Sequence, residues 1–292
     1  MWALRPGTRT GYARDRVPGQ HLPGGTSGLR GVRPDLCARG FGFGPNARGG
    51  DAFGGQVTKG PAHAPNWPEA LGRVTGGPWR PGGTGLTDRA LDILRPRPDC
   101  LCLDVGCGPG HTVAHLRAAH RLRALGLDRW AWPGAREAGP LVQGLAAQIP
   151  LCSGCLDLVL AECVLSLAGP LDKVLEEIAR VLRSGGGLAV LDFVSQSGGI
   201  GSRAGFEPSC CLAGAPDRES WERALAKAGF RLLAQEDHSL ELKQLAARLI
   251  LAHGSISAFA KALGPDNGGG CRIPARAGYH LFVAVKENGH GC

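Results

Sequence analysis

LCLDVGCGPG, residues Leu101–Gly110, is the stretch that decides the fold of this chain. Its apolar first half has the composition of a buried strand, and HTVAHLRAAH directly after it is compatible with a helix. Glycines at 106, 108 and 110 remove side chains where a ligand would approach the backbone. A dinucleotide-binding fingerprint would place its third glycine at position 111, which here is His111. The spacing predicts a strand–loop–helix unit and argues against a site for NAD or FAD.

The chain from about residue 85 onward alternates strand and helix patterns, which is typical of a doubly wound sheet. We therefore expect an α/β, Rossmann-like fold with a mostly parallel seven-stranded sheet and helices on both faces. The expected strands cover 101–105, 123–128, 141–143, 156–161, 188–194, 230–235 and 279–286. The expected helices cover 111–119, 219–228, a short segment capped by Thr87, and 171–183, which the glycines at 185–187 should end.

The connection between the last two expected strands is long, at about forty residues. It contains SLELKQLAARLILAHG, whose leucines recur at near-helical spacing. This pattern predicts a helical insertion before the last strand. The insertion would lie over the carboxyl edge of the sheet as a substrate cap or an oligomer surface, or it would add to the core.

Residues 1–66 differ in composition from the rest of the chain. They hold fifteen glycines and seven prolines, and they carry +6 of the formal net charge of +8. Such a segment buries too little apolar surface to offset the entropy of ordering, so we expect a disordered leader. It is either a misassigned start or a targeting or interaction tail. The small remaining charge argues against a nucleic-acid partner. We expect a folded domain over 67–287 and a short tail over 288–292.

Eleven cysteines and the lack of long apolar runs bear on location and partners. The cysteines are unevenly spaced, which argues against a disulfide framework and favours a reducing, cytoplasmic compartment. No run of 18 apolar residues and no apolar signal region near the start is present, so we expect no membrane partner. The single C-x-x-C at 152–155 lacks the second pair that a zinc site needs, so we expect no metal site.

Four segments together resemble the class I S-adenosylmethionine (SAM)-dependent methyltransferases of the methyltransferase type 11 group, over about residues 85–287. They are LDVGCGPG, the acidic end of GLD at Asp128, LDLV, and LDKVLEEIARVLRSGGGLAVLDF. The resemblance implies SAM as cofactor and methyl transfer by direct displacement. It also implies that Gly106, Gly108 and Gly110 let the backbone pass close to the methionine part of SAM, and that Asp104 orients this loop.

The rest of the expected cofactor site lies on the next two strands. Asp128 follows Gly110 by 18 residues, close to the offset of roughly 20 at which an acidic side chain meets ribose hydroxyls. Many relatives carry an aspartate after the third strand, whereas Leu145 stands at that point here. We therefore expect backbone groups near Ala146 and Ala147 to recognise the adenine.

Two cysteines bear on the methyl acceptor. AECVLSL, with Cys163, and SCCLAGAPDRESWERALAKAGF, with Cys211, resemble segments of the arsenite methyltransferases. That resemblance implies two thiolates that hold trivalent arsenic, a soft centre that soft sulfur ligands prefer. Such an acceptor carries a lone pair, so it needs no general base. The alternatives are cysteines that only pack in the core, a small-molecule O-, N- or C-methyltransferase, and a non-catalytic SAM-binding partner subunit.

Overall fold

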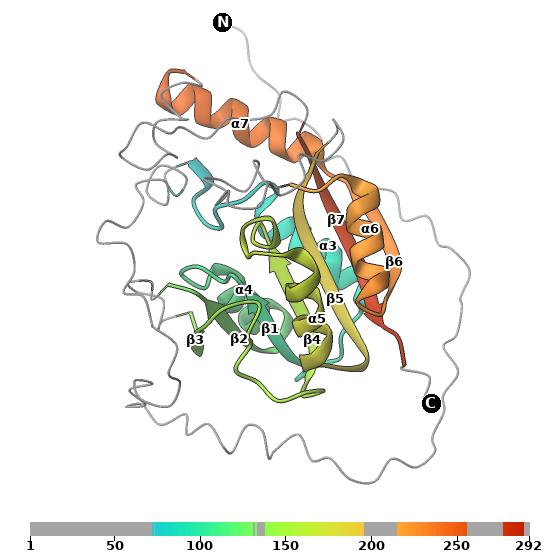
Figure 1. Cartoon of the computed structure of the whole chain (residues 1–292). Coiled ribbons are helices and arrows are strands. Elements are labelled where there is room, and N and C mark those ends of the chain that lie inside the picture. Colours follow the sequence, from blue (N-terminus) through green and yellow to red (C-terminus); the bar gives the residue numbers. More distant parts are fainter. Residues whose placement is uncertain are drawn as a thin grey trace, which may run out of the picture.

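The computed structural model describes residues 72, 74–130, 132, 138–195, 215–255 and 277–288. The predicted leader and most of the predicted tail fall outside these residues. The described part forms one seven-stranded sheet in the order β3-β2-β1-β4-β5-β7-β6 (Figure 1). The strands are β1 (Leu101–Val105), β2 (Arg123–Asp128), β3 (Leu141–Gln143), β4 (Leu156–Glu162), β5 (Leu182–Ser195), β6 (Phe230–Asp237) and β7 (Ala277–Lys286).

The sheet is parallel except for β7, which lies between β5 and β6. β1 pairs in parallel with β2 and β4, and β7 runs antiparallel to both β5 and β6. The chain order reverses between β1 and β4, so a crevice opens at the carboxyl ends of these two strands. This architecture confirms the expected doubly wound, mostly parallel sheet.

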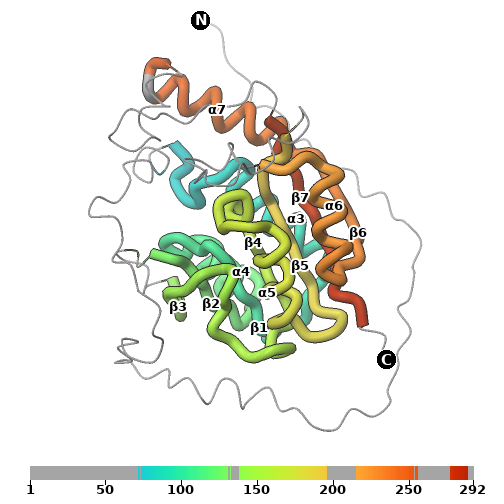
Figure 2. The backbone as a smooth tube through the Cα atoms, viewed as in Figure 1, coloured from blue at the N-terminus to red at the C-terminus, as the bar shows by residue number. Residues whose placement is uncertain are grey.

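Helices cover both faces, as expected. The helices α3 (Gly83–Leu94) and α4 (His111–His120) pack against one face, and α5 (Leu171–Val181) and α6 (Arg218–Lys227) against the other (Figure 2). Val113 and Leu116 of α4 are fully buried on the first face, while Ile178 and Trp221 are fully buried on the second. Both apolar layers are therefore closed, which leaves the crevice at the carboxyl edge of the sheet as the place where this fold would admit a ligand.

Two predictions about helix ends are wrong. The helix expected over 171–183 ends at Val181, because Leu182 is fully buried and pairs with Leu156 of β4. The glycines at 185–187 therefore lie inside β5, where a register shift follows this pair. Thr87 does not cap α3, which begins four residues earlier with Gly82 as its N-cap. Thr87 is instead a buried residue of the helix interior.

The predicted helical insertion is confirmed as α7 (Ser239–His253). It lies beyond the end of the sheet at which β5 ends and β7 begins (Figure 1). Leu245 and Leu249 are buried on α7 and pack against Val74 and Trp79, which precede α3. No helix in the described ranges is long and apolar enough to cross a membrane.

Candidate functional site

The glycine loop sits between β1 and α4, at the carboxyl edge of the sheet. Gly106 and Gly108 have φ angles of 73° and 53°, in the left-handed region that glycine tolerates best. A Cβ on Gly106 would come within 2.3 Å of Val164, so this position is closed by packing. A Cβ on Gly108 would meet nothing within 4 Å. The loop therefore faces open space at Gly108, where a ligand can approach the backbone.

Asp128, at the end of β2, is tied directly to this loop. Its Oδ2 accepts a hydrogen bond of 2.8 Å from the Gly108 amide, and its Oδ1 accepts one of 2.8 Å from the Trp130 amide. A carboxylate has about four lone-pair sites, so Asp128 can accept further hydrogen bonds from a ligand. The structure thus brings together the loop and the acidic residue that the sequence predicted.

Asp104 lies beneath the loop and is 2% exposed. Burial and the nearby Glu162 raise the pKa of Asp104 well above its ordinary value, although Arg80 acts in the opposite direction. A buried carboxyl in this state gains from a cationic partner. A ligand that carries an ammonium group would supply one.

Ala146 and Ala147 lie in a turn next to Asp128. The Gln148 amide donates to the Leu145 carbonyl across this turn at 3.0 Å, and the Gly144 amide donates to the Asp128 carbonyl at 2.8 Å. Both alanines are partly buried against the core, whereas Leu145 is 52% exposed. The predicted adenine segment is therefore held beside the predicted ribose residue.

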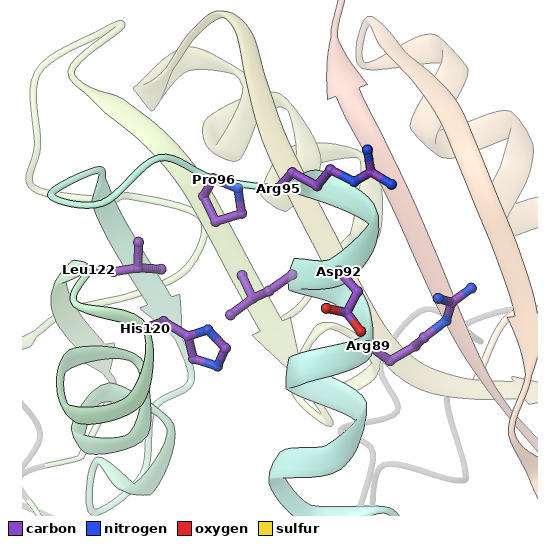
Figure 3. A pocket seen from close by; sticks show the side chains of 7 residues that line it. Arg89, Asp92, Arg95, Pro96, His120 and Leu122 are labelled. Atoms are coloured by element: carbon purple, nitrogen blue, oxygen red, sulfur yellow. The ribbon is translucent and has the colours of Figure 1, made fainter. Parts of the chain in front are cut away.

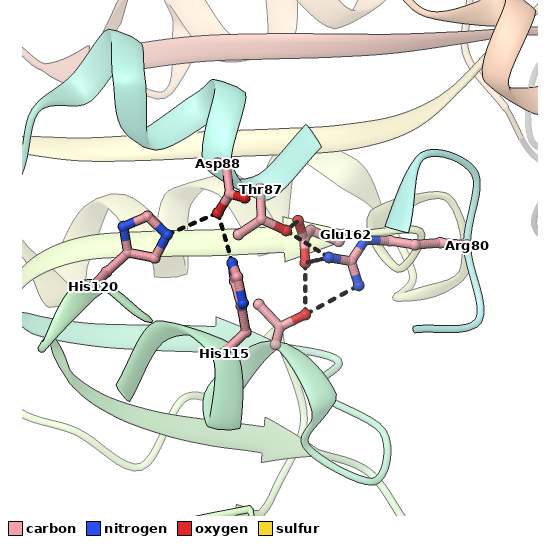
Figure 4. A network of polar contacts seen from close by, with 7 residues as sticks. Arg80, Thr87, Asp88, His115, His120 and Glu162 are labelled. Atoms are coloured by element: carbon pink, nitrogen blue, oxygen red, sulfur yellow. Dashed lines mark hydrogen bonds and ion pairs between the residues drawn. The ribbon is translucent and has the colours of Figure 1, made fainter. Parts of the chain in front are cut away.

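A buried polar network lies beside the glycine loop, between α3, α4 and the end of β4 (Figure 4). The Glu162 carboxylate, at the end of β4, accepts hydrogen bonds from Thr87 at 2.8 Å and Thr112 at 2.9 Å. Arg80 lies 2.7 Å from the same carboxylate and also donates to both threonines, at 2.6 and 3.0 Å. Sequence reasoning missed this network. Its only signal in the sequence was a charged residue, Glu162, directly after the apolar run LVLA of β4.

Arg80 is held as a cation by its surroundings. Burial alone would lower the pKa of Arg80, but the charge of the adjacent Glu162 carboxylate acts in the opposite direction, and the net shift is upward. Its Nε is buried and has no hydrogen-bond partner among the described residues. One donor of a buried guanidinium is thus left for a ligand.

Cys163 directly follows Glu162, at the mouth of the site. It adopts a φ angle of 58°, which is uncommon for a residue other than glycine. Its amide donates to the Leu191 carbonyl at 2.7 Å, and its thiol donates to the Tyr279 hydroxyl at 3.3 Å. Burial, and then the nearby Cys163, raise the pKa of Tyr279, so the hydroxyl stays neutral. The second predicted thiolate, Cys211, lies outside the described residues.

Aromatic rings stand beside the beginning of α4. The ring of Trp79 makes edge contacts with His111 and Trp132, at centroid distances of 5.7 and 5.4 Å. Burial and the charge of Arg80 lower the pKa of His111, which favours its neutral form. These rings give the mouth of the site an apolar, uncharged side.

Two cavities border α3, and they differ in their position relative to the site. A cavity of about 460 Å³ opens between α3 and the end of α4, lined by Asp92 and His120 among others, and no residue of the glycine loop borders it (Figure 3). A smaller cavity of about 200 Å³ is lined by Arg80, Gly82, Glu241 and Arg248, between α7 and the start of α3. Only the smaller one shares a residue, Arg80, with the network at the site.

Comparison with known proteins identifies the fold. Residues 103–190 match the family model of the methyltransferase domain. The [4+2]-cyclase SpnF has a similar structure, with a TM-score of 0.58 and 22% identity over 77% of this chain and 93% of that one. Phosphoethanolamine N-methyltransferase 2 of Haemonchus contortus, solved in complex with SAM, has a TM-score of 0.59 and 17% identity over 75% of this chain and 56% of that one. The fold is that of the class I methyltransferases.

The class I methyltransferase fold does not by itself decide the reaction, since one of these structures is described as a cyclase. Among curated proteins, an O-methyltransferase of Pyrenophora dematioidea is 32% identical over 126 residues, which are 39% of this chain and 46% of the relative. The chain spans about half the length of the curated relatives it matches. The activity therefore has to be argued from the residues of the site.

Proposed function

We propose that this chain is a SAM-dependent methyltransferase. The observation that carries the proposal is the glycine loop, which faces open space at Gly108 while Asp128 holds it at the carboxyl edge of β1 and β2. Asp128 would accept hydrogen bonds from the ribose, and the turn at Ala146 and Ala147 would border the adenine. Gly106 and Gly110 adopt positive φ angles, which the conformation of the loop requires.

The methionine end of the cofactor would lie between Asp104 and Arg80. Asp104 is a buried carboxyl that gains from a cation, and Arg80 keeps a buried Nε donor without a partner among the described residues. The amino acid group of SAM has an ammonium, which would pair with Asp104, and a carboxylate, which would accept a hydrogen bond from Arg80. When bound, SAM supplies an electrophilic methyl group.

The acceptor we propose is a soft, thiophilic centre such as trivalent arsenic, held by Cys163 and Cys211. Cys163 is half-buried at the carboxyl end of β4, in a backbone conformation that costs free energy and often marks functional positions. Glu162 is a poor general base, because both its oxygens already accept hydrogen bonds. The neutral Tyr279 hydroxyl is also no base. An acceptor that attacks through a lone pair fits a site of this kind.

The second candidate function is O-methyl transfer to a small organic acceptor. It is favoured by the curated relative named as an O-methyltransferase. In this case the cavity between α7 and the start of α3 would help to shape the acceptor site. Cys163 and Cys211 would then be dispensable for turnover.

A labelled-methyl assay with arsenite and a thiol tests the proposal. We expect turnover in the wild type and in the control Cys155→Ser, and its loss in Cys163→Ser and in Cys211→Ser. Equal turnover in all four proteins would remove the thiolate role, and turnover only on an organic acceptor would support the second candidate. Calorimetric titration with SAM decides the cofactor, because a chain that binds no SAM is not a methyltransferase of this kind.

A further inference from the structure

Three metal-ligating side chains meet on the outer side of the α3–α4 pair. Asp88 on α3 places its Oδ1 at 2.6 Å from Nε2 of His115 and at 2.7 Å from Nε2 of His120, both on α4 (Figure 4). One ligand atom from each residue lies within 4.8 Å of the other two. The cluster is separate from the glycine loop, and the proposed methyl transfer makes no use of it.

The cluster is accessible to an ion from solvent. All three side chains are only partly buried, with exposed fractions of 45% for Asp88, 21% for His115 and 30% for His120. His120 also borders the cavity of about 460 Å³, and Asp92, one helical turn after Asp88, lines the same cavity (Figure 3). Arg89 also lines it, but this cation is paired with Glu236.

We propose that Asp88, His115 and His120 bind a divalent transition-metal ion, of which Zn²⁺ fits best. Two imidazoles and one carboxylate suit Zn²⁺, which tolerates varied geometry and leaves the fourth position to water. Ligand atoms about 2.0–2.1 Å from a tetrahedral ion lie roughly 3.3 Å apart. The contacts of Asp88 with the two histidines, now 2.6 and 2.7 Å, would open by under about 1 Å, and the two histidine ligand atoms, within 4.8 Å of each other, would reach the same spacing by side-chain rotation. The Nε2 protons leave to solvent, and each neutral ring keeps its proton on Nδ1.

The ion would clamp one wall of the cofactor site. Asp88 is adjacent to Thr87, and His115 follows Thr112 by three residues on α4. Thr87 and Thr112 are the two hydroxyls that bond to Glu162 in the buried network. Because α3 and α4 carry both the proposed ligands and these two threonines, an ion between the helices would fix the positions of the threonines relative to each other. The inference does not depend on the methyl acceptor.

Cobalt binding to the reduced, metal-free full chain tests the site. Co²⁺ bound by nitrogen and oxygen gives visible d–d bands without the thiolate charge-transfer band that cysteine ligands add. We expect such bands in the wild type, with displacement by Zn²⁺, and binding weaker by at least about tenfold in His120→Gln, since loss of even an outer partner costs 10–100-fold. His238→Gln is the matched control, because His238 pairs with Glu236 outside this cluster.

A thermal melt gives a second readout, independent of activity. Zn²⁺ should raise the melting temperature of the wild type and of His238→Gln, but not of His120→Gln, because an ion that binds only the folded state stabilises it. If Asp88→Asn or His115→Gln loses its far-UV circular dichroism, His120→Gln, at the end of α4, still carries the test. Identical cobalt spectra and affinities in the wild type and His120→Gln would overturn the proposal.

Discussion

Replacing Glu162 with glutamine should strongly destabilise the protein, because it removes one charge from a buried pair and leaves the other. The side chains of Arg80 and Glu162 are 7% and 3% exposed, and 2.7 Å separates them. The glutamine amide nitrogen would replace an oxygen that now accepts a hydrogen bond, either from Thr87 or from Thr112 beside Arg80. The guanidinium would then remain buried without the charge that it now contacts directly.

The size of the effect follows from this environment. Removing one partner of a buried ion pair costs about 3–5 kcal/mol, a large part of the roughly 5–15 kcal/mol by which a domain is stable. Glu176→Gln is the same substitution in the exposed pair of Lys173 and Glu176, whose side chains are 70% and 51% exposed. Such surface pairs contribute only about 0–1 kcal/mol.

Guanidinium denaturation, followed by far-UV circular dichroism, measures both variants. Arg80→Met combined with Glu162→Gln should cost clearly less than the sum of the single substitutions, because the double variant buries no unpaired charge. The reasoning is refuted if Glu162→Gln is as mild as Glu176→Gln. Strict additivity in the double variant would refute it equally.

Three further predictions concern the loop and its surroundings. Gly108→Ala should weaken SAM binding in calorimetry, because its Cβ enters the open space at the loop and its φ is positive, whereas Gly85→Ala in α3, also facing open space, should leave binding unchanged. Hydrogen bonds from Arg180 lower the pKa of Glu177 from its ordinary 4.5, so Glu177 stabilises the fold above about pH 4.5 and loses this effect as the pH falls through the lowered pKa. Denaturation midpoints of the wild type and Glu177→Gln should therefore differ at pH 6, and the difference should shrink as the pH falls below 4.5. Burial raises the pKa of Cys107, so mass spectrometry should find this thiol unmodified by iodoacetamide in the native protein and modified after unfolding.

The sequence predicted those parts of the fold that local pattern determines. The bounds of β1, β2 and β3 agree with the expected ranges to the residue, because glycine and polar residues end each apolar run. The predicted end of α5 was wrong because a contact with a residue distant in sequence determines where the helix ends. Leu182 continues the helical apolar pattern, yet the sheet recruits it through its pairing with Leu156. Long-range strand pairing outweighs local helix propensity at such a boundary.

The site, like the fold, has residues that the sequence predicted and residues that only the structure shows. The loop and Asp128 were predictable because a motif with fixed spacing carries them. The network at Glu162 was not, since Thr87 lies 75 positions from Glu162 along the chain and Arg80 lies 32 positions from Thr112. The cluster of Asp88, His115 and His120 is hidden for the same reason, because the single aspartate that joins the two histidines lies on another helix.

The position of these unpredicted residues bears on where substrate specificity resides. The segment that matches the methyltransferase domain, 103–190, supplies the loop, Asp128 and Glu162, all of which face the cofactor side of the proposed site. Arg80 and Trp79, as well as α3 and α7, lie outside that segment but border the same mouth. A shared cofactor imposes common residues on a family, whereas the acceptor differs between members. Residues of α7 that line the smaller cavity, Glu241 and Arg248, are therefore the ones to vary in a search for acceptor specificity, and SAM affinity should stay constant when only α7 is changed.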